Sequence, residues 1–152
     1  MPLTHEFFLI RKEIMVDRQF YLSPPHEGIV VIHDDIITYI WDSLMWIPTH
    51  NPGKRNFPAD YGLNYHGVTI VQDGGAALLR DICLSWCTLF SLAPQTFQLK
   101  GAYTHSSGER IEEGGYEKIR CDRTELTKLL KDLANLADRA LTDGYCILHI
   151  GI

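Results

Sequence analysis

The sequence predicts a single α+β domain over residues 1–152, in which about three helices pack on a largely antiparallel or mixed sheet. A chain of 152 residues fits one domain and can bury roughly 70% of the surface that its unfolded form exposes. Three segments carry apolar residues at helical spacing, and several shorter segments are rich in β-branched and aromatic residues. A strand pair near residues 97–121 interrupts the strict strand–helix alternation of a doubly wound sheet, which favours α+β.

The first third of the chain predicts two strands and a helix. Residues 6–14 alternate loosely between apolar and polar side chains, and residues 28–33 contain a run of β-branched residues that is typical of a strand buried on both faces. Asp34 or Asp35 can cap the next helix, whose apolar residues recur at helical spacing as far as Ile47. Pro48 disfavours helical geometry in the residue before it, so the helix is expected to end there.

The middle of the chain predicts a strand, a long helix and a hairpin. Residues 65–71 are β-branched and aromatic, and the turn at 72–75 leads into a helix that continues to about residue 92. Residues 97–104 and 116–121 read as two antiparallel strands joined by a polar tip.

The last predicted elements are a helix and a strand. Asp122 with Glu125 three residues later is the carboxylate variant of a capping box, and the leucines that follow form one apolar stripe. Gly144 supplies a left-handed terminator for this helix. The final residues, YCILHIGI, are apolar enough for an interior strand, so the C-terminus is expected to be tied into the sheet.

Composition indicates a globular, acidic protein. The chain is 45% hydrophobic and 22% charged, and its formal net charge is -5. An acidic surface repels a phosphate backbone, so nucleic acid is not expected as a partner. The apolar run at residues 7–10 is too short for a signal peptide, and polar side chains interrupt residues 76–92. We therefore expect no membrane association and a cytoplasmic location.

The four cysteines predict buried thiols. Cys83, Cys87, Cys121 and Cys146 lie within apolar or amphipathic periodic segments. Cys83 and Cys87 share one helix face and could hold a metal, but their apolar neighbours favour packing. Cys146 and His149 are three residues apart on a strand, so they point to opposite faces and cannot bind one ion. No metal and no cofactor are predicted.

The sequence His33-Asp34-Asp35, at a strand-to-helix junction, has the composition of an acid/base or metal site. Helix capping and the helix dipole explain the two acids equally well without a substrate.

Two glycine-flanked positions also admit two interpretations. Asp73, before Gly74 and Gly75, could accompany an anion site on bare helix amides, or it could cap the helix. His149, beside Gly151, is interpreted as a hydrogen-bonded core histidine, although the glycine could leave space for a ligand.

Residues 46–67 form the candidate binding segment. A connection of this length without regular structure is uncommon in a compact domain and is often functional. Its aromatic and charged residues resemble the make-up of protein interaction hot spots, although the aromatics could instead pin the loop onto the core. The candidate binding residues are Trp46, His50, Lys54, Arg55, Phe57, Asp60, Tyr61, Tyr65 and His66.

Two functions from different classes fit these observations. The first is a small cytoplasmic macromolecule-binding module, for instance an inhibitor or immunity-type protein, that binds another protein through the 46–67 loop and the hairpin tip at 106–115. The second is a small enzyme whose polar groups converge only in three dimensions. Those groups are His33, Asp34, His50, His66, Cys121 and His149.

Geometry separates the two hypotheses. An enzyme should have a concave pocket with at least two of those six side chains within hydrogen-bond reach, whereas a module should have a flat or convex aromatic patch. The sequence favours the module and predicts no oligomeric state.

Overall fold

A four-stranded sheet forms the body of the protein, in a computed structural model that describes residues 3–14, 16–108 and 110–152. Its strands are β1 (Thr4–Arg11), β2 (Gly28–His33), β5 (Val68–Val71) and β8 (Tyr145–Ile150). They lie in the order β2-β1-β8-β5, and each neighbouring pair is antiparallel. The α+β class is therefore confirmed, and the C-terminal strand lies inside the sheet as predicted.

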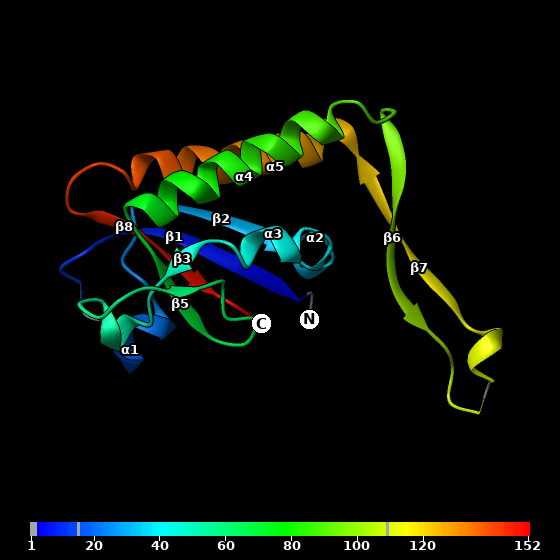
Figure 1. The fold of residues 1–152 in the computed structure, drawn as a ribbon, viewed down its shortest axis with the longest axis horizontal. Helices are drawn as coiled ribbons and strands as arrows, with labels where there is room; N and C mark the ends of the chain where they lie inside the picture. Colours follow the sequence, from blue (N-terminus) through cyan, green and yellow to red (C-terminus); the bar gives the residue numbers. More distant parts are fainter. Residues whose placement is uncertain (1–2, 15, 109) are drawn as a thin grey trace.

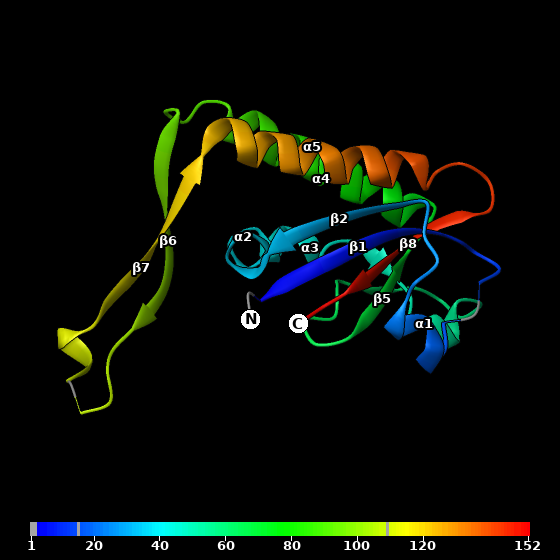
Figure 2. The same cartoon turned by 180° about the vertical axis from the view of Figure 1, so that it is seen from behind.

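Two long helices, α4 (Gly74–Phe90) and α5 (Arg123–Arg139), lie side by side across one face of the sheet (Figures 1 and 2). The Asp122 side chain accepts a hydrogen bond from the Glu125 N–H at 2.9 Å, which caps α5 as predicted. Gly144 has a φ of 85°, the left-handed conformation that the sequence indicated.

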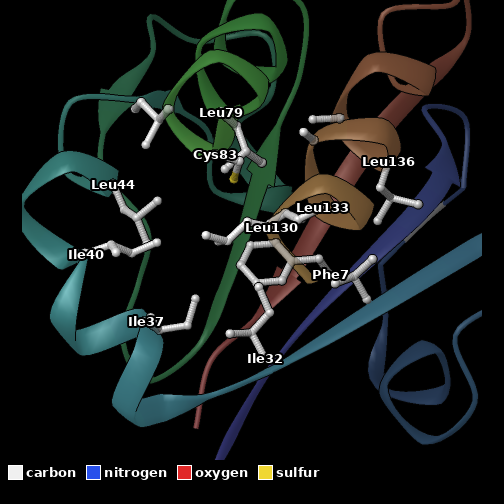
Figure 3. Packing of buried hydrophobic residues seen from close by; sticks show 14 of the residues in the cluster. Phe7, Ile32, Ile37, Ile40, Leu44, Leu79, Cys83, Leu130, Leu133 and Leu136 are labelled. Atoms are coloured by element: carbon white, nitrogen blue, oxygen red, sulfur yellow. The ribbon is translucent and has the colours of Figure 1, made fainter. Parts of the chain in front are cut away.

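The helices and the sheet enclose the main hydrophobic core. Leu130 and Leu133 of α5 have no exposed surface, and they face Phe7 and Ile32 of the sheet (Figure 3). On the opposite face of the sheet a smaller cluster joins Phe8 and its neighbours to the short helix α1 (Arg18–Leu22). Alternate residues of β1 therefore serve two cores, because successive strand side chains point to opposite faces.

The predicted hairpin is an arm that stands away from the body, at the end of the helix layer (Figure 1). Its strands are β6 (Thr96–Thr104) and β7 (Gly115–Asp122), with a short 3₁₀ turn, η2 (Ile111–Glu113), near the tip. A register shift between Lys100 and Tyr103 marks a β-bulge in the ribbon. Leu99 and Cys121 are buried where the arm meets the body.

Strand β2 and the helix after it differ from the sequence prediction. The side chains of Ile29 and Val31 are exposed, so β2 is buried on one face only. The single predicted helix is two short helices, α2 (Asp34–Tyr39) and α3 (Trp41–Leu44). Its cap is the His33 side chain, which accepts a hydrogen bond from the Asp35 N–H at 3.1 Å. The Asp34 carboxylate is engaged elsewhere and cannot cap.

The 46–67 segment is not devoid of regular structure. It contains the strands β3 (Pro48–Thr49) and β4 (Asp60–Tyr61), which pair with each other, and the 3₁₀ turn η1 (Pro52–Lys54). The described residues thus contain five α-helices rather than about three, and the two extra ones are a turn or two long. None of the helices in these ranges is long and apolar enough to cross a membrane.

Candidate functional site

A recess of about 480 Å³ lies in the angle between α2 and the arm. Its walls come from three parts of the chain that are distant in sequence: α2, the end of the 46–67 segment and both strands of the arm. The lining residues are Asp34, Asp35, Thr38, Tyr39, Tyr65, Lys100, Gly101, Ala102, Glu117 and Ile119.

The recess has a negative lining. Its lining residues include the acids Asp34, Asp35 and Glu117 and one basic residue, Lys100. The Lys100 amine lies 3.6 Å from the centroid of the Tyr116 ring, so it contacts an aromatic face of the arm. Glu117 forms no ion pair with any residue that the structure describes. Acidic residues therefore outnumber basic ones three to one in the lining.

A buried hydrogen-bond network stands behind the Asp34 carboxylate. The Tyr65 hydroxyl donates to both carboxylate oxygens, at 2.7 and 2.8 Å, and His5 Nε2 donates to one of them at 3.1 Å. His5 Nδ1 lies 2.9 Å from His149 Nε2. The network thus ties strands β1 and β8 to the start of α2 and to the end of the 46–67 segment.

The positions of the imidazole hydrogens follow from the Asp34 carboxylate at one end of the network. A carboxylate only accepts, so His5 Nε2 carries a hydrogen and His5 Nδ1 is free to accept from His149 Nε2. His149 Nδ1 then carries no hydrogen, and it is buried without a hydrogen-bond partner among the described residues. Both imidazoles are neutral in this arrangement.

The pKa values agree with that assignment. The pKa of His149 is lowered to about 3, chiefly by burial and to a lesser extent by the nearby His5. Burial also lowers the pKa of His5, against the opposing effect of the Asp34 carboxylate. Burial alone would raise the pKa of Asp34, but the hydrogen bonds from Tyr65 and His5 outweigh it and lower that pKa. Asp34 is therefore the charged member of the network at neutral pH.

The network is enclosed rather than open to a substrate. His5 and His149 have no exposed surface, and neither lines the recess. Gly151 leaves no space above His149, because a Cβ there would lie 2.0 Å from the Tyr65 carbonyl oxygen. The predicted ligand space beside that glycine is therefore absent, and His149 is the core histidine of the alternative interpretation.

The six candidate catalytic groups do not meet in one pocket. Asp34 is the only one of the six that lines the recess, and it reaches His149 only through His5. The other four are dispersed. His33 caps α2, the His50 backbone pairs with Ile70, His66 Nδ1 donates to the Ile152 carbonyl, and Cys121 is buried at the base of the arm.

The candidate residues of the 46–67 segment also separate. Phe57, Tyr61, Lys54 and Asp60 are exposed, and they form the outward part of the segment. Arg55 instead donates a hydrogen bond from Nη1 to the Lys12 carbonyl, which pins the segment to the end of β1. Arg55 is therefore only partly exposed, whereas its neighbour Lys54 is exposed.

The remaining aromatics face different surfaces. Trp46 is 64% exposed and lies with Trp86 and Leu89 along an apolar groove beside α4. Tyr65 turns inward to the Asp34 carboxylate, and its ring packs edge-on against Trp41 at 5.3 Å between centroids. The segment thus combines both interpretations: part of it pins the loop, and part of it is exposed.

The other glycine- and cysteine-based candidates have structural explanations. The Asp73 side chain makes no cap hydrogen bond and pairs with the Lys12 amine at 2.7 Å, so the predicted capping role is wrong. Cys83 is fully buried in the core, where burial raises the pKa of its thiol to about 12. Within the described ranges, no three or more His, Cys, Asp or Glu side chains are grouped to hold a metal ion.

Sequence reasoning missed His5, Lys100 and Glu117. The predicted first strand began at Glu6, two residues after the observed start of β1 at Thr4. Extending it would have placed His5 on the same face as Phe7 and Leu9, which are buried. Lys100 and Glu117 carry no such signal, because the sequence does not indicate which face of the arm turns toward α2.

Comparison with known proteins finds no matching family model, no similar curated protein and no similar solved structure.

Proposed function

We propose that this chain is a protein-binding module that holds a partner in the angle between α2 and the arm, with a cationic side chain of the partner in the recess. The observation that carries the proposal is the recess itself, which has three acidic residues in the lining of a space of about 480 Å³. That space accommodates a lysine or arginine side chain, and a guanidinium can pair with carboxylates in a bidentate manner. An inhibitor or immunity-type protein is one kind of module that fits this description.

The arm supports a binding role. A two-stranded hairpin is at best marginally stable by itself in water, and the outer part of this arm packs mainly against its own residues. It exposes Tyr103, Ile111 and Tyr116, and tyrosine in particular is enriched at the centres of protein interfaces. A bound partner would cover these side chains and order the ribbon.

The burial of the histidines favours binding over catalysis. A general base must come within hydrogen-bond reach of the proton that it removes. His5 and His149 have no exposed surface, so they support the Asp34 carboxylate from behind instead of meeting a substrate.

The 46–67 segment contributes Tyr65 to the lining of the recess. Its exposed residues Phe57, Tyr61 and Lys54 remain proposed contacts for a large partner, and Trp46 is a further proposed contact beside α4. Arg55 is excluded as a clean probe, because its bond to the Lys12 carbonyl makes its replacement a change in structure as well as in charge.

The test measures binding to a partner that is captured from the source cells with the intact chain and then purified. Glu117→Gln and Asp35→Asn each remove one recess carboxylate, and Asp42→Asn, at an exposed position on α3, is the matched control. Each recess variant should weaken the affinity about tenfold, measured by calorimetry, and the loss should shrink as salt is added.

A shortened arm provides the second variant. Replacing residues 101–117 with Asn-Gly joins the paired residues Lys100 and Lys118 through a two-residue turn and leaves the base of the arm intact. Its melting curve should match that of the intact chain, and it should not bind the partner. Equal affinity of the intact chain, both recess variants and the shortened chain for the purified partner would refute the proposal.

A further inference from the structure

Strand β2 forms an open edge of the main sheet. It pairs with β1 in continuous register from Thr4–His33 to Leu9–Gly28, and no described strand pairs with its other side. The opposite edge, β5, is covered, because the His50 and Ile70 backbones exchange hydrogen bonds of 2.8 and 2.9 Å. The 46–67 segment thus closes one edge of the sheet, and β2 is left without an equivalent cover.

The open edge lacks the devices that usually prevent strand pairing. Exposed edges are commonly interrupted by proline, lysine or a bulge. The sequence of β2, GIVVIH, contains neither residue, and its register with β1 has no shift. Two of its aliphatic side chains, Ile29 and Val31, are 44% and 42% exposed on the same face of the sheet. Such an edge is a template for another strand.

The backbone of β2 is oriented for that pairing. The Asp34 N–H donates to the Leu3 carbonyl at 3.0 Å and so continues the ladder between β1 and β2. Bonded residues alternate along an antiparallel strand, so the even-numbered residues of β2 bond to β1. The N–H and C=O groups of Ile29 and Val31 therefore point to the open side, next to a groove of about 350 Å³ between β2 and α5.

We propose that β2 pairs antiparallel with β2 of a second copy of this chain, so that two four-stranded sheets become one continuous sheet. Symmetric pairing about Val30 places Ile29 of one copy opposite Val31 of the other, twice. Opposed residues in an antiparallel pair share a face, so the four exposed aliphatic side chains gather into one patch.

Charge complementarity identifies a second copy as the occupant. The start of β2 is net positive, with two guanidinium groups and one carboxylate: the Arg139 guanidinium donates to the Glu27 carbonyl at 2.9 Å, and Arg11 pairs with the Glu27 carboxylate at 3.5 Å. The end of β2 is acidic, because His33 is followed by Asp34 and Asp35. Antiparallel pairing of two copies brings each basic start beside the acidic end of the other.

The test is sedimentation of the full chain across concentrations from about 1 μM to about 1 mM. Val31→Lys places a charge at the centre of the pairing edge, at a side chain that is exposed in the single chain. Leu84→Lys is the matched control, because Leu84 is also 42% exposed but lies on α4. Ile29→Lys is the second edge variant.

The intact chain and the Leu84→Lys variant should dimerise with the same affinity, and both edge variants should dimerise at least about tenfold more weakly. Amide hydrogen exchange should also slow at Ile29 and Val31 as the concentration of the intact chain rises. A monomer at every concentration would overturn the proposal, and so would a dimer that the edge variants leave intact. Neither edge variant changes a recess residue, so these variants test the dimer separately from the binding of a partner in the recess.

Discussion

Acid should destabilise this protein through the buried imidazole of His149. The pKa of His149 is lowered from 6.5 to about 3, chiefly by burial, so the folded chain does not bind a proton there at pH 5. The unfolded chain does. Stability rises with pH wherever the unfolded state binds more protons, so the contribution of His149 is complete above about pH 6.5 and is lost progressively as the pH falls toward 3.

The size of the effect follows from the difference between the two pKa values. A pH of 5 is about 1.5 units below the pKa of the unfolded imidazole, which is near 6.5, so the unfolded chain is protonated there. The folded imidazole is still neutral at this pH. At about 1.4 kcal/mol per unit, His149 alone lowers the free energy of unfolding by about 2 kcal/mol between pH 7 and pH 5. The pKa of His5 is lowered in the same direction and adds to the slope.

The assay is urea denaturation at a series of pH values from about 7 to about 4.5. His149→Gln removes the titrating ring and keeps an N–H that can donate to His5 Nδ1, so its stability should fall less with acid, by about 2 kcal/mol at pH 5. His105→Gln, at an exposed position on the arm, controls for the loss of a histidine. Parallel curves for the intact chain and His149→Gln would refute the reasoning, since the buried imidazole would then contribute nothing to the pH dependence.

Three further predictions concern a core leucine, the buried thiols and the glycine that packs against the Tyr65 backbone. Leu130→Ala should lower the free energy of unfolding by about 2 to 5 kcal/mol, because Leu130 has no exposed surface; a change under about 0.5 kcal/mol in urea melts would mean that the stripe of α5 does not pack. All four thiols should be free under reducing conditions, but Cys83 and Cys146, with pKa values of about 12 and about 11, should react with a thiol reagent only after unfolding; rapid reaction in native buffer would contradict their burial. Gly151→Ala should lower the free energy of unfolding by about 1 to 3 kcal/mol in thermal or urea melts, since its Cβ would lie 2.0 Å from the Tyr65 carbonyl oxygen. An unchanged melt would show that the backbone at Tyr65 moves aside without loss of stability.

The elements that the sequence predicted well are those with local causes. The start of α5 depends on Asp122 and Glu125, three residues apart, and its burial depends on one leucine stripe. The arm was indicated by two β-branched and aromatic runs on either side of a polar tip. Each of these signals lies within a few residues of the structure that it specifies, so no tertiary contact was needed to interpret it.

The elements that were predicted wrongly depend on contacts from elsewhere in the chain. Asp34 or Asp35 was expected to cap α2, but His33 caps the helix, and His5 and Tyr65 bind the Asp34 carboxylate. The burial of β2 was overestimated, because a run of β-branched residues does not reveal whether a neighbouring strand or helix covers the second face. Tertiary context overrides local preference at both places.

The candidate site could be predicted only in part, because it too depends on contacts between residues that are distant in sequence. Asp34 and His149 were identified together as candidate groups of an enzyme, and Tyr65 was identified separately as a binding residue of the 46–67 segment. His5 and His149, which join those groups, are 144 positions apart in sequence. Nothing in a sequence without a strand order places them on neighbouring strands, whereas the order β1-β8 in the sheet does so at once.

The network and the recess share the Asp34 carboxylate, and this gives the buried histidines a role without chemistry. A carboxylate at the wall of an open recess can rotate toward water, and holding it in place for a partner costs side-chain freedom at the moment of binding. Here the Tyr65 hydroxyl and His5 Nε2 fix both its position and its charge before any partner arrives. His149 in turn holds His5 in the one tautomer that can donate to Asp34. Burial favours the uncharged form of both imidazoles, and under the proposed function this pair keeps one negative charge in one orientation at the recess.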